Sequence, residues 1–224
     1  MGLTKTQKII SYILKAIIII SATVGTYLSA LGSIEAFMGG ETVFMYFTIQ
    51  SNIAIAIVSL IGIYFLATNK SNYAWSVIKF VFTISITLTG IVYTFVLAPS
   101  MGNETWNIQN VLTHVVVPIC SIIDFFIVGR SLYIKNRDVL YVVIPPLLYA
   151  IYAGIGYVLN WRFSSTTNYP YFFLNWGSKA GAIGFTNELP FIGVIWWILL
   201  LFIFLILVGL LYIKVLNTIK KKQA

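Results

Sequence analysis

Six long apolar runs dominate this 224-residue chain. Each run reaches the roughly 20 residues that a helix needs to cross the hydrocarbon of a bilayer, where only helices and closed barrels satisfy their backbone polar groups. Strict alternation of apolar and polar residues is absent, so a barrel is not expected. The chain is therefore predicted to be an all-α, polytopic membrane protein with six transmembrane helices. We place them, to within several residues, at 9–31, 43–67, 75–98, 108–132, 139–159 and 191–216.

The charged residues support this prediction and exclude a soluble protein. Only 9% of the residues are charged, against about 25% in an average soluble domain. The net charge of +8 is no sign of a nucleic-acid partner, because the basic residues are distributed among the ends of the spans and form no single patch. The partners expected are the membrane and a lipid, with no nucleic acid.

The lysines and arginines also predict the orientation of the chain. With the N-terminus in the cytoplasm, only Arg162 and Lys179 of the 14 basic residues lie on the outer side, which is the distribution that the positive-inside rule requires. Both termini are therefore predicted to be cytoplasmic. The Ile- and Lys-rich composition suggests a bacterial cell membrane.

The organisation along the chain predicts a single domain over residues 1–224. There is no internal repeat of the transporter type, and the only long connection is an outer loop at about 160–190, a length that is usually functional in a compact fold. The chain has one histidine and one cysteine, His114 and Cys120, which do not make a zinc site. No metal and no cofactor are expected.

Polar residues recur at helical spacing in the second and fourth spans and predict inward-facing surfaces. The second span contributes Thr48, Ser51, Asn52, Ser59 and Gly62, and the fourth contributes Asn110, His114, Ser121 and Asp124. Both spans descend from the outer side, and at 1.5 Å per residue Thr48 and His114 share a level about 8 Å below the outer surface. A lone histidine inside a span is costly and is a functional candidate.

Asp124 is ten residues beyond His114, which is about 15 Å deeper. It is therefore not expected to orient the imidazole as the acid of a triad. An ion pair with Lys79 or Lys15 is the favoured interpretation, and a place on a proton path is the alternative.

Two motifs resemble those of a known family. The second span contains YFTIQSN at 46–52, and the fourth carries Thr113 and His114 followed by Pro118 and Asp124. Together they are similar to motifs of the androgen-induced and androgen-dependent TFPI-regulating protein family of six-span membrane proteins, including its bacterial relatives. The segment YPYFFLNW at 169–176 resembles an outer loop of the bacterial branch.

The resemblance implies an intramembrane hydrolase of fatty acid esters of hydroxy fatty acids, or of a related amphiphilic ester. Carried across by motif, the catalytic threonine is Thr48 and the histidine is His114. Such a threonine needs an adjacent base to become a nucleophile, and an acyl-threonine intermediate would follow. Asn52, one turn below Thr48, is the side-chain candidate for stabilising the oxyanion, and Asn110, one turn above His114, is the candidate for fixing the histidine tautomer. The further candidates for contacting the substrate or the oxyanion are Ser51, Asn175 and Trp176.

An alternative function remains open from the sequence. The polar inner faces also fit a small lipid-binding protein or a transporter with a polar path through the bundle, in which Lys79, Asp124 and His114 would line the path. The absence of repeats argues against a transporter, whereas Pro118, Pro145 and Pro146 are possible helix breaks of the kind that transporters use.

Overall fold

The computed structural model describes residues 2–32, 39–100 and 105–222. It confirms the all-α class: six helices are long and apolar enough to cross a membrane, and the described residues form no strand. The spans are α1 (Lys5–Leu31), α2 (Phe47–Ala67), α3 (Tyr73–Val92) continued by η2 (Tyr93–Leu97), α4–η4–α5 (Ile108–Val111, Leu112–Val116 and Val117–Ile127), η6–α6 (Asn136–Val143 and Ile144–Val158) and α7 (Val194–Lys222). Short 3₁₀ turns are η1 (Gly40–Met45), η3 (Ala98–Ser100), η5 (Gly129–Ser131) and η7 (Phe172–Leu174).

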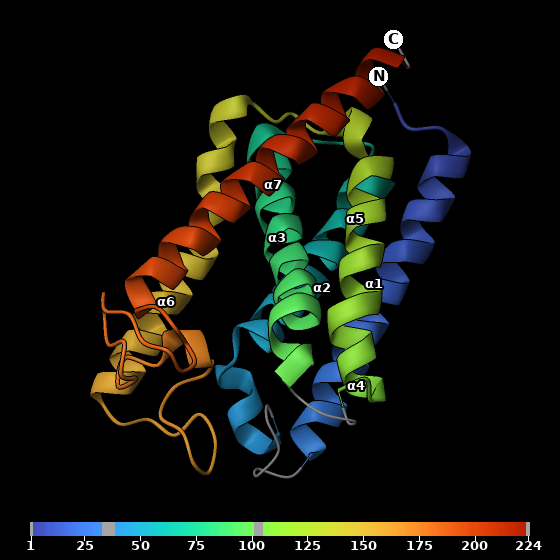
Figure 1. Ribbon diagram of the computed structural model, residues 1–224. Helices are drawn as coiled ribbons and strands as arrows, with labels where there is room; N and C mark the ends of the chain where they lie inside the picture. The colour runs from blue at the N-terminus through green and yellow to red at the C-terminus, as the bar shows by residue number, and fades with distance from the viewer. Residues whose placement is uncertain (1, 33–38, 101–104, 223–224) are drawn as a thin grey trace.

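The helices form one bundle with both termini at the same end (Figure 1). Helices α1, α2, α3 and α5 pack against one another, and α7 crosses η6 and α3 on the other side of the bundle. Side chains of α3, α5 and α7 meet in an apolar cluster that includes Phe80, Phe125 and Tyr212. The shared end is the one that the charge distribution predicts to be cytoplasmic.

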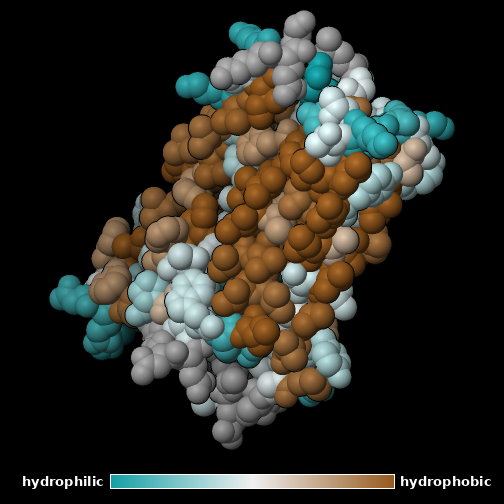
Figure 2. Space-filling model, turned by 90° about the vertical axis from the view of Figure 1, so that its right-hand side faces the viewer, coloured by the Kyte–Doolittle hydropathy of each residue, from teal (hydrophilic) through white to brown (hydrophobic). Residues whose placement is uncertain are grey.

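The outer surface of the bundle has the polarity of a membrane protein. Figure 2 shows a broad hydrophobic band between hydrophilic groups at the two ends. Helix α7 contributes much of this apolar surface, since only 17% of its most apolar window is buried. A bundle with this surface requires a bilayer or detergent.

Prolines and turn geometry account for two of the span ends that differ from the prediction. The second span begins at Phe47, because residues 40–45 form a 3₁₀ turn. The fifth begins in 3₁₀ form at Asn136 and becomes α-helical at Ile144, since Pro145 and Pro146 lack the N–H groups that an α-helical ladder would need there. The fourth ends earlier, at Ile127, and the sixth continues to Lys222.

The connection between α6 and α7 is folded back onto the bundle. Phe163, Tyr171, Phe173 and Leu174 from this connection are buried in an apolar cluster with Tyr46, Ile49, Tyr93 and Tyr149. The Tyr46 hydroxyl donates to the Phe163 carbonyl at 2.9 Å. This connection therefore builds one wall of the interior near the start of α2.

Candidate functional site

His114 lies in a π-helical turn that Pro118 imposes. The turn closes with the Val117 N–H on the Leu112 carbonyl, a bond over five residues. Pro118 has no N–H to donate to the carbonyl four residues back, which is that of His114. Gly90 of α3 accommodates the released carbonyl, because a Cβ at Gly90 would lie 3.0 Å from the His114 oxygen. Single π turns of this kind occur frequently at functional sites.

The hydrogen bonds of His114 define its tautomer. Nδ1 lies 3.0 Å from the Asn110 carbonyl and 3.0 Å from Thr113 Oγ1. A carbonyl only accepts, and the Thr113 hydroxyl already donates to the Gln109 carbonyl at 2.8 Å, so Nδ1 carries the proton. Nε2 then has a lone pair, and it is buried without a hydrogen-bond partner among the described residues. A histidine in this state can act as a base at Nε2.

Tyr93 covers the imidazole from the neighbouring helix. The two rings are stacked, with centroids 3.6 Å apart, and Tyr93 begins a π turn of its own, closed by the Ala98 N–H on the Tyr93 carbonyl. Pro99 follows that turn, as Pro118 follows the turn of His114. The Tyr93 hydroxyl donates to the Thr105 carbonyl, which also accepts from Asn110 Nδ2 at 3.0 Å. Two proline-linked π turns thus hold the two rings face to face.

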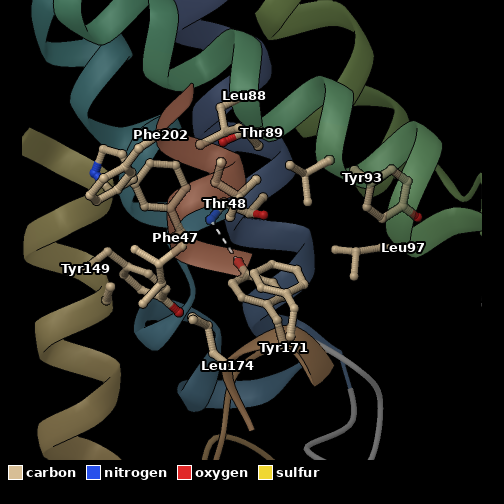
Figure 3. Close-up of a pocket in the computed structure, with 16 residues that line it drawn as sticks. Phe47, Thr48, Leu88, Thr89, Tyr93, Leu97, Tyr149, Tyr171, Leu174 and Phe202 are labelled. Atoms are coloured by element: carbon tan, nitrogen blue, oxygen red, sulfur yellow. Dashed lines mark hydrogen bonds between the residues drawn. The ribbon is translucent and has the colours of Figure 1, made fainter. Parts of the chain in front are cut away.

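Thr48 lies in the first turn of α2 and is 4% exposed. It faces a pocket whose walls are almost entirely apolar and aromatic, built from α2, α3, α6, α7 and the 171–174 segment (Figure 3). The pocket has a cavity volume of about 60 Å³, which is room for about two water molecules. In this state the pocket is therefore closed to a lipid.

Tyr171 is the polar group nearest to Thr48 on the loop side. Its hydroxyl accepts from the Thr48 backbone N–H at 3.4 Å, the bond drawn in Figure 3. Burial raises the pKa of Tyr171, and hydrogen bonds with the Thr48 side chain and backbone oppose that shift. The phenol therefore stays protonated at neutral pH.

Thr48 and His114 lie in neighbouring elements but form no hydrogen bond with each other in the described part of the chain. Asn52 connects the two elements: its amide donates to the Thr48 carbonyl at 2.8 Å and to the Thr113 carbonyl at 3.2 Å. Tyr93 lines the Thr48 pocket and stacks on His114. The arrangement therefore places the nucleophile candidate and the base candidate on either side of a shared aromatic side chain.

The other residues predicted for the site bond mainly to the protein itself. The Ser51 hydroxyl lies 2.7 Å from Thr89 Oγ1 and 2.9 Å from the Thr48 carbonyl. Asn110 holds His114 through its backbone carbonyl rather than its side chain. Asn175 Oδ1 accepts from the Gly177 N–H at 3.0 Å, and neither Asn175 nor Trp176 lines the Thr48 pocket. Both amide protons of Asn52 are directed to carbonyls, so in this conformation neither is offered to a substrate.

Tyr93 is the site residue that the sequence reasoning missed. It stands in an ordinary apolar run, and nothing about its type marks it. The available signal is the pair of prolines, Pro99 just after the third span and Pro118 in the middle of the fourth, each removing one helical N–H. Sequence alone does not indicate that the two turns they shape face each other.

A second polar cluster lies deeper in the bundle. Asp124 is fully buried and pairs with Lys15 at 2.6 Å and with Lys79 at 2.5 Å. Ser11 Oγ donates to the same carboxylate at 2.5 Å. The predicted pairing of Asp124 is confirmed, with both lysines rather than one.

Comparisons with protein-family models, with curated proteins and with solved structures find no match to this chain. The fold and the surface define a helical membrane protein. A fold of this class does not specify an activity, which depends on the residues of the site.

Proposed function

We propose that this chain is an intramembrane hydrolase of amphiphilic lipid esters, with Thr48 as nucleophile and His114 as base. The observation that carries the proposal is the state of His114: a buried imidazole whose Nδ1–H is fixed by two acceptors and whose Nε2 has no partner in the described chain. Leaving such an atom unpaired in an apolar interior costs free energy, and a catalytic role accounts for its retention. The motif resemblance around Thr48 and His114 supports the same assignment.

The chemistry follows the pattern of an activated hydroxyl. Nε2 removes the Thr48 proton as Oγ1 attacks the ester carbonyl carbon, and a tetrahedral oxyanion forms. Collapse breaks the bond to the alkoxy oxygen, which leaves as an alcohol with the proton from Nε2. Water then attacks the acyl-threonine with His114 again as base, releasing the acid and restoring Thr48. Hydrogen bonds of this kind are often absent before substrate binds and form in the complex.

Access to the site depends on its aromatic walls. Because the cavity volume of about 60 Å³ is far smaller than a lipid, the substrate enters as side chains such as Tyr93 and Phe173 move apart. The apolar lining favours acyl chains over charged groups. An ester near the outer boundary with its chains in hydrocarbon fits this position and enters from the bilayer.

Activity-based labelling tests the proposal. A lipid-like fluorophosphonate applied to the purified protein in detergent should modify Thr48, with the adduct located by mass spectrometry. Thr48→Ala and His114→Ala should not be labelled, whereas Thr48→Ser should be, because it keeps the hydroxyl. Absence of labelling in a wild-type protein that melts cooperatively would argue against a hydrolase and favour a lipid-binding or transport protein.

Tyr171→Phe is expected to lower hydrolysis by about 10²-fold, because Tyr171 is the hydroxyl placed to stabilise the oxyanion beside Thr48. Since burial raises the pKa of Tyr171 above the ordinary tyrosine value, this donor should remain protonated up to about pH 9, and the wild type should lose no activity through it below that pH. Rates of ester hydrolysis from pH 7 to 10 check both points. Tyr169→Phe, in the same loop and outside the pocket lining, is the matched control. Equal rates for wild type and Tyr171→Phe would remove Tyr171 from the mechanism.

Pro118→Ala should reduce labelling of Thr48 more than tenfold without unfolding the protein. Alanine restores the N–H that can bond the His114 carbonyl, so the π turn is expected to revert to an α turn and rotate the imidazole away. The measurement combines labelling with the melting temperature. Pro145→Ala, which changes a proline of the fifth span remote from His114, should leave labelling unchanged. If Pro118→Ala labels like the wild type, the π turn does not position the base.

A further inference from the structure

A large cavity at the other end of the bundle is separate from the Thr48 pocket. Its volume is about 700 Å³, and it lies among α1, α2, α3 and the segment after α5, at the end where the termini meet. The cavity opens to solvent at a mouth lined by exposed residues such as Asn69 and Lys70. Its inner end is formed by Lys15 and Lys79, which are 2% and 3% exposed.

The charges at the inner end of this cavity do not balance. Two buried ammonium groups, Lys15 and Lys79, share one carboxylate, Asp124, which leaves one excess positive charge. None of the acidic side chains in the described part of the chain, Asp124 included, lines this cavity. An uncompensated buried charge is costly, so a binding partner of opposite sign would be strongly favoured.

The hydrogen bonds show which lysine carries the spare capacity. Lys15 Nζ contacts both Asp124 oxygens, at 2.6 and 2.8 Å, and donates to Ser11 Oγ at 2.7 Å. Lys79 Nζ makes one hydrogen bond, to Asp124 Oδ2 at 2.5 Å. An ammonium has three donors, so two donors of Lys79 have no partner among the described residues, and Lys79 is one of the residues that line the cavity.

The cavity walls combine this basic group with an aromatic surface. Trp75 lines the cavity and is stacked on Phe65, with ring centroids 4.7 Å apart. Gly62 leaves room for the Lys15 stem, because a Cβ there would lie 2.7 Å from Lys15 Cε. Aromatic walls around a buried cation suit an acidic group attached to an apolar chain.

We propose that this cavity is a binding site for an anionic group, a carboxylate or a phosphate, held by Lys79 and carried by an amphiphile of the inner leaflet or by a free anion. Charge-assisted bonds from an ammonium to such oxygens are the strong class of hydrogen bond. The site is independent of the hydrolase proposal, since it shares no residue with the Thr48 pocket.

Quenching of tryptophan fluorescence tests the site directly. Dibromostearate is added to the full chain in a neutral detergent, with dibromostearyl alcohol as the uncharged match. The acid should quench at a concentration about tenfold or more below that of the alcohol, as one charge-assisted hydrogen bond implies. Trp75→Phe should remove the extra quenching, which locates the ligand in this cavity. Lys79→Met should abolish the preference for the acid, and Lys79→Arg should keep it.

A second probe separates the two sources of the anion. If inorganic phosphate displaces the acid, or raises the melting temperature of the wild type but not of Lys79→Met, the site takes a free anion. If the acid quenches and phosphate neither displaces it nor stabilises the protein, the anion is lipid-borne. Equal affinity of wild type for the acid and the alcohol, together with no effect of phosphate, would overturn the proposal. Because this comparison uses the wild type, it decides even if Lys79→Met fails to fold.

Discussion

Thr48→Ala and His114→Ala should each lower the rate of ester hydrolysis by at least about 10³-fold, with the folded protein retained. Removing the nucleophile hydroxyl leaves no atom to form the acyl intermediate, and removing the base leaves the hydroxyl at its unreactive free pKa. Because the two groups act in one step, the double variant should be little worse than either single variant. The measurement is kcat for a long-chain ester in mixed micelles, with melting temperatures recorded for each variant.

Matched controls distinguish catalysis from folding in that experiment. Thr113→Val removes the hydroxyl adjacent to His114 but leaves the Asn110 carbonyl to hold Nδ1, so it should cost far less than His114→Ala. Thr89→Val alters a hydroxyl at the same pocket that bonds Ser51 and should retain most activity. Full activity in Thr48→Ala would show that another group is the nucleophile, and activity losses of equal size in all variants would indicate damaged packing.

The spans and their polar faces follow from local pattern, which is why the sequence predicts them well. Hydropathy over about 20 residues is a property of the segment itself, and Thr48, Asn52, His114 and Asp124 are all buried as their helical spacing predicts. The pairing of Asp124 with lysine was also predictable, because charges inside a bilayer must find partners. These features need no knowledge of which helix packs against which.

The contacts of the candidate site depend on packing order and were not predictable in the same way. Tyr93 stacks on His114 because two π turns on different helices face each other, and no local pattern encodes that. Tyr171 contacts Thr48 although the two residues are 123 positions apart in the sequence. Tyr171 belongs to the connection between α6 and α7, which hydropathy predicts as a loop without indicating what it packs against. The use of both lysines by one carboxylate similarly requires α1, α3 and α5 to converge.

Asp124→Asn should lower the free energy of unfolding by about 3–5 kcal/mol, the cost of leaving buried charge without its partner. In the wild type this one carboxylate accepts from Lys15, Lys79 and Ser11, and asparagine leaves two buried ammonium groups side by side without a carboxylate. By contrast, the triple variant Lys15→Met, Lys79→Met, Asp124→Leu should be nearly as stable as the wild type, because no charge remains to be solvated.

Comparison with an exposed ion pair shows that burial, not pairing itself, sets the size of this effect. Lys179 and Glu188 also approach to 2.5 Å, but their side chains are 72% and 65% exposed, so Glu188→Gln should change stability little. Unfolding by sodium dodecyl sulfate in mixed micelles measures all of these variants on one scale. If the Asp124→Asn protein is as stable as Glu188→Gln, water or a bound anion already solvates the two lysines. The groups in the adjacent cavity, rather than the ion pairs with Asp124, would then stabilise the lysine charges.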